Sequence, residues 1–290
     1  MKVLIIGSSG MLGKALVREA KFRTFECFGV DLEDADYNIN ITSYLKLKEL
    51  ISYLQPNLII NTVAIVNLLE CENNPEKAYN VNAKPAKFLA DLSRSTNAYF
   101  IHISTDHFYS GDKGSLHKEE NRISLFNEYA KTKYVAEEYA LSNPSALIVR
   151  TNIIGFRYKE NKTFLEWVLD SLENKKHMIL FEDFYTSSID VKQFSKALFD
   201  LIDKRPKGVL NLASSEVFSK KRFIQSLASV VGYDLSNTST GSIFSLNDGI
   251  IRAESLGLDV SIAERLLEYK LPNLDQVIQS IVSEFNERIL

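Results

Sequence analysis

The chain of 290 residues is poor in the residue types that build disulfide frameworks and metal sites. It has two cysteines, Cys27 and Cys71, and neither belongs to a C-x-x-C pair. Its four histidines are scattered, and none lies in an H-E-x-x-H sequence. We therefore expect neither a disulfide framework nor a bound metal. His102 lies within an apolar run, and we predict that it is a hydrogen-bonded core residue.

The chain also lacks clustered positive charge and long apolar runs. Its 34 basic and 37 acidic residues give a net charge of −3, which is a poor match for sequence-independent nucleic-acid binding. The short basic cluster Lys220–Arg222 is interpreted as a solvated helix start. The apolar run at Val3–Ile6 is too short for a signal peptide, and no stretch reaches the ~18 apolar residues that span a membrane. These absences predict a soluble, cytoplasmic protein without nucleic-acid or membrane partners.

Apolar runs and helical patterns alternate through the first half of the chain. The predicted strands are Val3–Ile6, Phe25–Val30, Leu58–Ile60, Tyr99–Ile103 and Ala146–Arg150. The predicted helices are Met11–Lys21, Tyr44–Leu54, Pro75–Ser93, which Pro85 must kink or split, and Asn127–Leu141. Alternation at this spacing is typical of βαβ units in an α/β fold, so we expect a Rossmann-like, doubly wound parallel sheet.

The second half of the chain is less regular. Helices are predicted at Phe164–Leu172, Val191–Asp203, Lys221–Val231 and Leu274–Glu287, with a strand at Val209–Leu212 and a loop at Gly241–Asp248. We expect residues 1–155 to form one domain, rejoined by part of 188–212, and residues 156–290 to form mainly a smaller C-terminal α/β part.

A G-x-x-G-x-x-G motif lies at the turn from the first predicted strand to the first helix. Gly7 suits the tight turn, Gly10 allows a pyrophosphate to approach the backbone, and Gly13 allows close helix packing. The free N–H groups at the helix start, which include those of Met11 and Leu12, attract negative phosphates. The motif alone also fits a plain glycine-rich turn, but a strand before it and a helix after it favour a dinucleotide site in residues 1–155.

An acidic residue, Asp31, ends the second predicted strand, 18 residues after the last motif glycine. A carboxylate at about this spacing binds the adenosine ribose of NAD and repels the 2′-phosphate of NADP. NAD is therefore mildly favoured over NADP, although Lys21 and Arg23 nearby weaken the argument. Glu33 or Asp34 takes this position if the strand ends later.

A Tyr-x-x-x-Lys pair places a phenol and an ammonium on one helix face, where the ammonium lowers the pKa of the phenol. Four such pairs occur, and they begin at Tyr44, Tyr109, Tyr129 and Tyr158. Only Tyr129 and Lys133 begin the helix that follows the fourth strand, so this pair is the catalytic candidate.

The fourth predicted strand ends in Ser104-Thr105. Ligands of open parallel sheets bind beyond the carboxyl ends of the strands, which brings one of these hydroxyls near Tyr129. Taken alone, the segment Ser104-Thr105-Asp106 fits a helix or turn cap better than a catalytic role. Its combination with the tyrosine–lysine pair and the glycine motif favours a catalytic role.

Three stretches resemble the extended short-chain dehydrogenase/reductase family, and most closely its dTDP-4-dehydrorhamnose reductases and related nucleotide-sugar 4-keto reductases. They are Gly7–Gly13, Ser104–Gly111 and Asn127–Glu137. Weaker matches occur at Glu72–Ala83 and at Arg150-Thr151. The likeness covers about the first 155 residues well and the remainder loosely.

The resemblance implies hydride transfer from NAD(P)H to the keto group of a nucleotide-linked sugar of the 4-keto-6-deoxy type, in surface polysaccharide synthesis. Tyr129 would protonate the oxygen, Lys133 would lower the pKa of Tyr129 and bind the nicotinamide ribose, and Thr105 would hydrogen-bond the carbonyl. The implied cofactor residues are Gly7, Gly10, Met11, Leu12, Gly13, Asp31, Ala64 and Lys133. The implied substrate residues are Asp106, Asn152, Arg222 and Arg252. Because a nucleotide sugar is a dianion, Arg150 and Lys162 are further candidates for its diphosphate, and a homodimer is left open.

Three departures from the family pattern bear on the substrate. Asp106-His107 replaces the Asp-Glu pair of the dehydratases, which argues against water loss. Asn152-Ile153 replaces a tryptophan, and Phe184–Ser188 lacks the proline of a Pro-Thr motif, so the sugar need not be rhamnose. Two alternatives remain: a nucleotide-sugar epimerase of the same fold, and a non-catalytic NAD(P)-binding regulatory subunit that resembles the β subunit of methionine adenosyltransferase.

Overall fold

The computed structural model describes residues 1–111, 113–159 and 161–289. These residues form two compact units, each built from separate parts of the chain. The first unit contains residues 1–105, 125–150 and 198–210, and the second contains residues 106–124, 151–197 and 211–290. Residues 106–124 thus pack with the second unit, although the sequence pattern placed them with the first.

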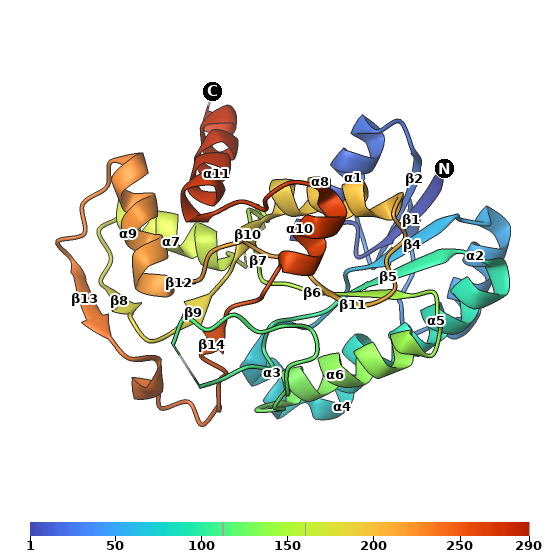
Figure 1. Ribbon diagram of the computed structural model, residues 1–290, viewed down its shortest axis with the longest axis horizontal. Coiled ribbons are helices and arrows are strands. Elements are labelled where there is room, and N and C mark those ends of the chain that lie inside the picture. Colours follow the sequence, from blue (N-terminus) through green and yellow to red (C-terminus); the bar gives the residue numbers. More distant parts are fainter. Residues whose placement is uncertain (112, 160, 290) are drawn as a thin grey trace. The chain divides into compact units, whose positions relative to one another are not determined.

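The first unit is built on a seven-stranded sheet (Figure 1). Its strands are β1 (Lys2–Ile6), β2 (Glu26–Asp31), β3 (Tyr37–Asn38), β4 (Leu58–Asn61), β5 (Tyr99–Ile103), β6 (Leu147–Arg150) and β11 (Gly208–Asn211). They lie in the order β11-β6-β5-β4-β1-β2-β3, and each neighbouring pair from β6 to β3 is parallel. The order reverses between β1 and β4, where doubly wound sheets bind ligands. The predicted α/β, Rossmann-like fold is confirmed.

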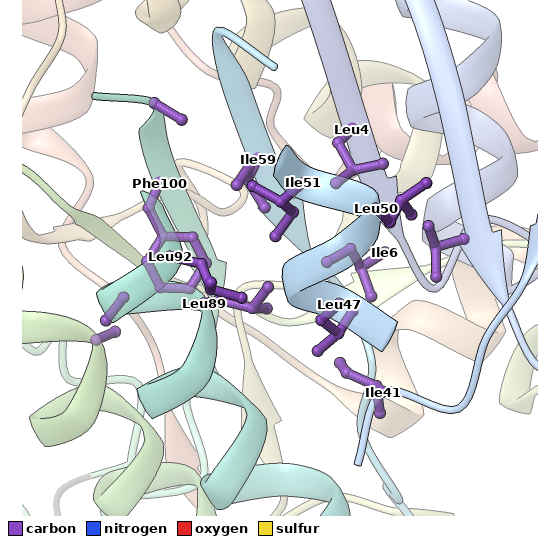
Figure 2. Packing of buried hydrophobic residues seen from close by; sticks show 14 of the residues in the cluster. Leu4, Ile6, Ile41, Leu47, Leu50, Ile51, Ile59, Leu89, Leu92 and Phe100 are labelled. Atoms are coloured by element: carbon purple, nitrogen blue, oxygen red, sulfur yellow. The ribbon is translucent and has the colours of Figure 1, made fainter. Parts of the chain in front are cut away.

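Helices cover both faces of this sheet, because its strands are apolar on both sides. The main helices are α1 (Met11–Phe22), α2 (Tyr44–Leu54), α5 (Lys84–Thr96) and α6 (Glu128–Leu141). Figure 1 shows α2, α5 and α6 on one side and α1 on the other. Leu4 and Ile6 pack with Leu47, Leu89 and Phe100 on the first side (Figure 2). The intervening residues of β1 are equally buried and face the other side.

The predicted helix at Pro75–Ser93 is divided into three segments. A short helix α4 (Pro75–Ala78) runs into a π-helix η1 (Tyr79–Ala83), and α5 follows. Pro85 lies in the first turn of α5, where its missing N–H costs no helical hydrogen bond. In the π-helical register the N–H of Lys84 donates to the carbonyl oxygen of Tyr79. The expected split at Pro85 is confirmed.

The second unit combines helices with short strands. Its helices are α7 (Phe164–Glu173), α9 (Lys220–Val231), α10 (Ser261–Leu267) and α11 (Leu274–Ile289), with the first part of α8 (Val191–Ile202) and the 3-10 turn η2 (Ile243–Ser245). Its strands are β7 (Ile153–Ile154), β8 (Met178–Phe181), β9 (Tyr185–Thr186), β10 (Ile189–Asp190), β12 (Phe218–Ser219), β13 (Thr238–Gly241) and β14 (Ser255–Leu256). They form small sheets of two or three strands, in agreement with the expected C-terminal α/β part, although this unit is not smaller than the first.

One apolar core joins α7, β8, α9 and α11 in the second unit. Local signals fix the helix starts: Thr163 and Glu166 form a capping box at α7, and the Ser219 hydroxyl caps α9. Among the described residues, no helix is both long and apolar enough to cross a membrane.

Candidate active site

The glycine motif forms a tight turn from β1 to α1. Gly7 has φ +90°, and a Cβ there would lie 2.3 Å from Thr62 Oγ1. A Cβ on Gly13 would lie 1.9 Å from the carbonyl oxygen of Gly7, so close packing excludes a side chain there. At Gly10, the nearest atom to an added Cβ is 3.2 Å away, and α1 starts without a side-chain cap. The buried hydroxyl of Ser8 has no hydrogen-bond partner among the described residues. The loop therefore fits a phosphate-bearing ligand.

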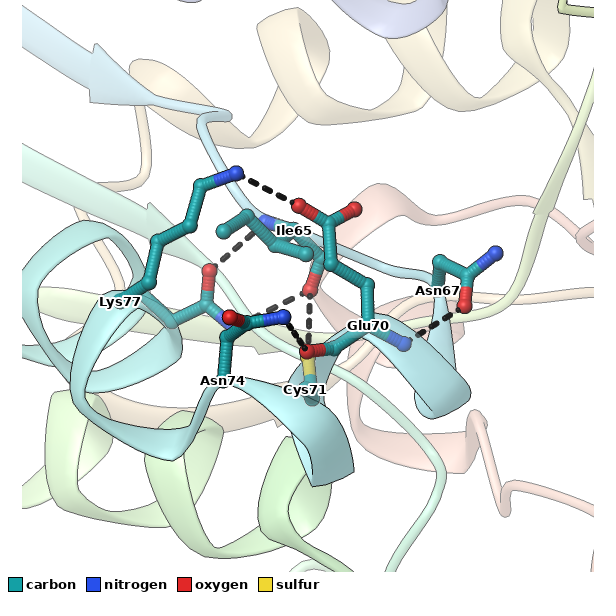
Figure 3. Close-up of polar contacts among 7 residues, drawn as sticks. Ile65, Asn67, Glu70, Cys71, Asn74 and Lys77 are labelled. Carbon is teal, nitrogen blue, oxygen red and sulfur yellow. Dashed lines mark hydrogen bonds and ion pairs between the residues drawn. The ribbon is translucent and has the colours of Figure 1, made fainter.

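A cavity of about 850 Å³ adjoins this loop, at the carboxyl ends of β1, β2 and β4. Its lining consists of Ile6, Val30, Asp31, Leu32, Ile39, Asn40, Ile41, Thr42, Val63, Asn73, Asn74, Pro75, Glu76, Lys77, Asn80 and Val81. Its volume and mixed apolar and polar lining suit the adenosine half of a dinucleotide. Within it, Lys77 Nζ lies 2.8 Å from Glu70 Oε1, so its charge is partly neutralised (Figure 3). The sequence pattern did not single out Asn40 and Thr42, which lie beyond the glycine and acidic signals.

Asp31 is held against the glycine loop. Its Oδ2 accepts hydrogen bonds from the backbone N–H of Ser9 (3.0 Å) and from the Ser9 hydroxyl (2.9 Å). Arg23, which weakened the argument for NAD, is bound at 2.7 Å by Glu19 and at 2.6 Å by Asp200. The structure thus brings Asp31 to the loop and pairs the Arg23 guanidinium with two other carboxylates.

The segment after β4, which includes Ala64, is fixed by buried polar contacts. Asn82 in the π-helix accepts from the N–H of Ile65 (2.7 Å) and donates to the Ile65 carbonyl (3.1 Å). The Cys71 thiol donates to the same carbonyl at 3.5 Å (Figure 3). Burial raises the pKa of this thiol to about 11, so Cys71 is unreactive at neutral pH.

Tyr129 and Lys133 lie on consecutive turns of α6, both buried. Asn127 starts the helix, and its side chain accepts from the N–H of Ala130 at 2.9 Å. The Lys133 ammonium donates to the Ile103 carbonyl oxygen (2.7 Å) at the carboxyl end of β5, two residues before Thr105. Burial lowers the pKa of Lys133 to about 8, partly opposed by the charge of Glu137.

Ser104 and Thr105 have different surroundings. The Ser104 hydroxyl donates to Glu137 Oε1 at 2.6 Å, and Glu137 also binds Arg150 at 2.7 Å through Nη2. Both residues are buried. Arg150, a candidate for the diphosphate, is thus buried in a salt bridge that supports the end of β5, which is a structural role.

Asp106 begins a buried polar chain in the second unit. Its Oδ2 accepts from the Asn152 side-chain amide at 2.8 Å, and Asn152 Oδ1 accepts from the Ser188 hydroxyl at 2.6 Å. The Ser188 and Thr186 hydroxyls lie 2.9 Å apart. The structure therefore brings together Asp106 and Asn152, which the resemblance implied as substrate residues. It connects them to the segment that lacks the expected proline.

Lys220 does not fit the interpretation as a solvated helix start, which is wrong for this residue. Its ammonium lies 4.2 Å from the ring centre of Phe164 and 5.8 Å from that of Phe184. Burial lowers its pKa to about 8, while Asp106 acts in the opposite direction. Burial, together with the charges of Lys220 and Arg252, lowers the pKa of His107 to about 4, so His107 is neutral at physiological pH. The sequence alone gave no sign of this grouping, because a run of basic residues does not show which of them faces inward.

The remaining basic candidates are each paired with a neighbouring carboxylate. Lys162 lies 2.8 Å from Asp170, and Arg222 lies 2.7 Å from Glu216. Arg252 binds Asp248 through both terminal nitrogens. The side chain of Arg222 is 55% exposed, whereas that of Arg252 is 18% exposed.

The doubly wound sheet, the glycine loop and the tyrosine–lysine pair define an oxidoreductase of the extended short-chain dehydrogenase/reductase type, which uses NAD or NADP. Residues 1–287 match the family described as RmlD substrate binding domain, and the chain belongs to this family. The predicted resemblance is confirmed.

Curated relatives agree with this assignment. The chain is 25% identical over 297 residues to a Haloferax volcanii protein named as a probable low-salt glycan biosynthesis reductase, with 99% of each chain covered. It is 28% identical over 176 residues to a dTDP-4-dehydrorhamnose reductase from Aggregatibacter actinomycetemcomitans, covering 60% of this chain and 58% of the relative.

Solved structures share the fold. A dTDP-4-dehydrorhamnose reductase from Bacillus anthracis, in complex with NADP, has a TM-score of 0.88 at 21% identity, covering 98% of this chain and 99% of the other. The Bordetella bronchiseptica enzyme WbmG, in complex with NAD, has a TM-score of 0.82 at 16% identity, covering 99% and 94%. Proteins of this fold therefore hold either dinucleotide.

Proposed function

We propose that this protein reduces the keto group of a nucleotide-linked sugar, of the 4-keto-6-deoxy type, with NADH or NADPH in glycan or polysaccharide synthesis. One observation carries the proposal. Tyr129 and Lys133 lie on consecutive turns of α6, and Lys133 is bonded to the end of β5 two residues before Thr105. A protein that only binds a dinucleotide does not require a buried phenol and ammonium, such as those of Tyr129 and Lys133, at the ligand-binding edge of the sheet.

Each residue of this group has a distinct part in the reaction. The reduced nicotinamide, when bound, supplies a hydride to the carbonyl carbon. The Tyr129 phenol donates its proton to the carbonyl oxygen, so that a ketone becomes an alcohol. The positive charge of Lys133 favours the resulting phenolate, and the Thr105 hydroxyl orients the carbonyl by hydrogen bonding.

The cofactor preference follows from Asp31. Its carboxylate is fixed by Ser9 at the edge of the cavity, where it can accept hydrogen bonds from the ribose hydroxyls. The same negative charge opposes a 2′-phosphate, and Arg23 is engaged by two carboxylates. We therefore expect NADH to bind more tightly than NADPH.

Substrate binding is assigned to the second unit. The Asp106–Asn152 pair offers hydrogen-bonding groups for a sugar, and Arg222 and Arg252 remain the candidates for the diphosphate. We add Lys220, whose ammonium is held over Phe164. The chain has a net charge of −3 and does not attract a dianionic ligand as a whole, so a local positive charge such as this one is needed.

The proposal is tested by a thermal-shift panel of nucleotide sugars, with NADH or NADPH present, followed by assays of reductant consumption. A ligand that binds the folded state raises the melting temperature, and a keto-sugar substrate then consumes NADH stoichiometrically. Interconversion of two sugars without net NADH consumption would show an epimerase instead.

Two tyrosine variants on the same helix assign the proton donor. Tyr129→Phe should bind NADH with unchanged affinity and lose turnover by about 10²–10⁴-fold. Tyr134→Phe removes a less buried phenol from α6 and should keep full activity. Full turnover in Tyr129→Phe would refute the proposed mechanism.

A further inference from the structure

A buried histidine lies next to Lys133. The Nε2 atom of His102 is 3.5 Å from Lys133 Nζ, which also donates to the Ile103 carbonyl oxygen. Its Nδ1 atom is 3.2 Å from the side-chain nitrogen of Asn61. His102, Asn61 and Lys133 are each at most 2% exposed, so protein groups decide their protonation. The prediction of a hydrogen-bonded core histidine is confirmed.

The hydrogen bonds around Asn61 determine which nitrogen of His102 carries the proton. The backbone N–H of Val63 points at Asn61 Oδ1 from 3.2 Å, and a backbone N–H can only donate. The amide oxygen is therefore on the Val63 side, and the NH₂ group faces His102 Nδ1. Because an NH₂ group donates, Nδ1 must accept, and it carries no proton.

The proton of neutral His102 therefore lies on Nε2. Burial, with a smaller contribution from the charge of Lys133, holds the pKa of His102 well below its ordinary value, so the ring is neutral. The Nε2–H bond points toward Lys133 Nζ. An ammonium has only donors to offer this N–H, whereas an amine offers a lone pair that can accept from it.

Two further titratable residues lie one turn away from Lys133 on the same helix, and Glu137 acts on its charge. Glu137, one turn later on α6, favours the ammonium, but its carboxylate is shared with Arg150 of β6 and Ser104. Tyr129 lies one turn earlier on the same helix. Burial favours the amine, and the Nε2–H of His102 acts in the same direction as burial.

We propose that His102 is a positioning residue that acts through Lys133: its fixed Nε2–H tautomer makes the Lys133 ammonium easier to deprotonate in the free protein. The hydrogen bonds of Val63 and Asn61 keep the proton of His102 on Nε2. This N–H then lies against the Lys133 ammonium and disfavours its positive charge. The inference rests on the proposed function only in taking Lys133 as the lysine of the active site. It concerns the free protein. The tautomer can therefore be disproved while the reductase activity is confirmed, and the activity can be disproved while the tautomer is confirmed.

The tautomer is measured directly by ¹⁵N NMR of protein labelled at histidine, without cofactor or substrate. The His102 signals are assigned as those that disappear in His102→Gln. We expect a pyridine-like Nδ1 and a pyrrole-like Nε2 that persist as the pH is lowered through neutrality. A protonated Nδ1, or an imidazolium at neutral pH, would overturn the proposal.

The consequence for Lys133 is measured by ¹³C NMR titration of lysine labelled at Cε, with Lys133→Arg used for assignment. His102→Gln can turn its amide oxygen toward the ammonium, and we expect a Lys133 titration midpoint about one pH unit higher than in the wild type. His102→Leu removes the N–H without supplying an acceptor, and we expect a smaller rise.

The exposed Lys131 on the same helix is the internal control, and its midpoint should be the same in all three proteins. Retained NADH binding shows that each variant is folded. A Lys133 midpoint that stays unchanged in both variants contradicts the proposal, because this is the result that a purely structural histidine predicts. A midpoint that falls in His102→Gln contradicts the proposal as well. If both variants fail to fold, the ¹⁵N NMR measurement of the His102 tautomer in the wild-type protein still tests the proposal.

Discussion

Glu137 and Arg150 form an ion pair of 2.7 Å whose side chains are 1% and 5% exposed. The Glu137 carboxylate also accepts from the Ser104 hydroxyl, which ties α6 and β6 to the end of β5 within the first unit. Breaking a buried pair leaves one charge desolvated and uncompensated, whereas replacing both partners by apolar groups removes that penalty.

Arg150→Met should therefore lower the free energy of unfolding by about 3–5 kcal/mol, measured by urea denaturation. The double variant Glu137→Leu/Arg150→Met should recover a large part of this loss. Arg94→Met, which breaks an exposed pair with Asp91, should change stability by less than about 1 kcal/mol. Equal losses in the buried and the exposed variant would contradict the structural role of Arg150.

Asp31→Ser should weaken NADH binding about tenfold, because the carboxylate that accepts the ribose hydroxyls is lost. NADPH should lose less affinity, since a repulsive charge is removed at the same time. Fluorescence titration of both cofactors gives the ratio of dissociation constants. Glu33→Ser is the matched control, and a change in the ratio there but not in Asp31→Ser would assign the cofactor site to Glu33.

Asp190 is a buried carboxyl whose Oδ1 accepts from two backbone N–H groups of α8 and from Ser280. Its Oδ2 has no hydrogen-bond partner among the described residues. Burial raises the pKa of Asp190 from 3.8 to about 6, against these hydrogen bonds. The folded state therefore binds this proton more tightly than the unfolded state. The resulting stability is fully present below about pH 4 and is lost as the pH rises through about 6.

His107 gives the opposite slope in the same range, since burial and the nearby cations lower its pKa from 6.5 to about 4. Its contribution is present above pH 6.5 and is lost as the pH falls. The two effects are separated with Asp190→Asn, whose stability relative to the wild type should increase between about pH 4 and pH 7, by at most about 3 kcal/mol. Urea denaturation across this range measures it. Parallel curves for the two proteins would show that Asp190 does not titrate as described.

Lys220→Met should raise the KM for the nucleotide sugar about tenfold, because it removes a half-buried positive charge that interacts with Asp106 in the second unit. Steady-state kinetics measure the KM for the nucleotide sugar, and NADH titration measures the NADH dissociation constant. We expect the NADH dissociation constant to stay the same. Lys221→Met removes a neighbouring lysine that pairs with Glu182, and it should have little effect on either constant. Equal effects of the two variants on the KM would contradict the proposed role of Lys220 in substrate binding.

Much of the first unit could be predicted from local sequence. The strand at Tyr99–Ile103 and the helix at Tyr44–Leu54 were predicted with the bounds that the structure shows, because short apolar runs and 3.6-residue periodicity are local signals. The spacing of the three glycines located a turn that only small residues can form. The second unit was harder, because five of its strands are only two residues long and depend on distant partners for pairing.

The sequence by itself determined the doubly wound sheet, the glycine loop and the tyrosine–lysine pair, since each depends on residues close together in the chain. Only the tertiary structure decided which charged groups are buried, and with what partner. Arg150 appeared as a free cation and lies in a buried ion pair, whereas Lys220 appeared solvated and lies over an aromatic ring. The environment of Lys133 was likewise hidden, because Asn61 lies on β4 and His102 on β5, whereas Lys133 lies on α6. Burial and pairing set the pKa of such groups, and both arise only when distant segments pack together.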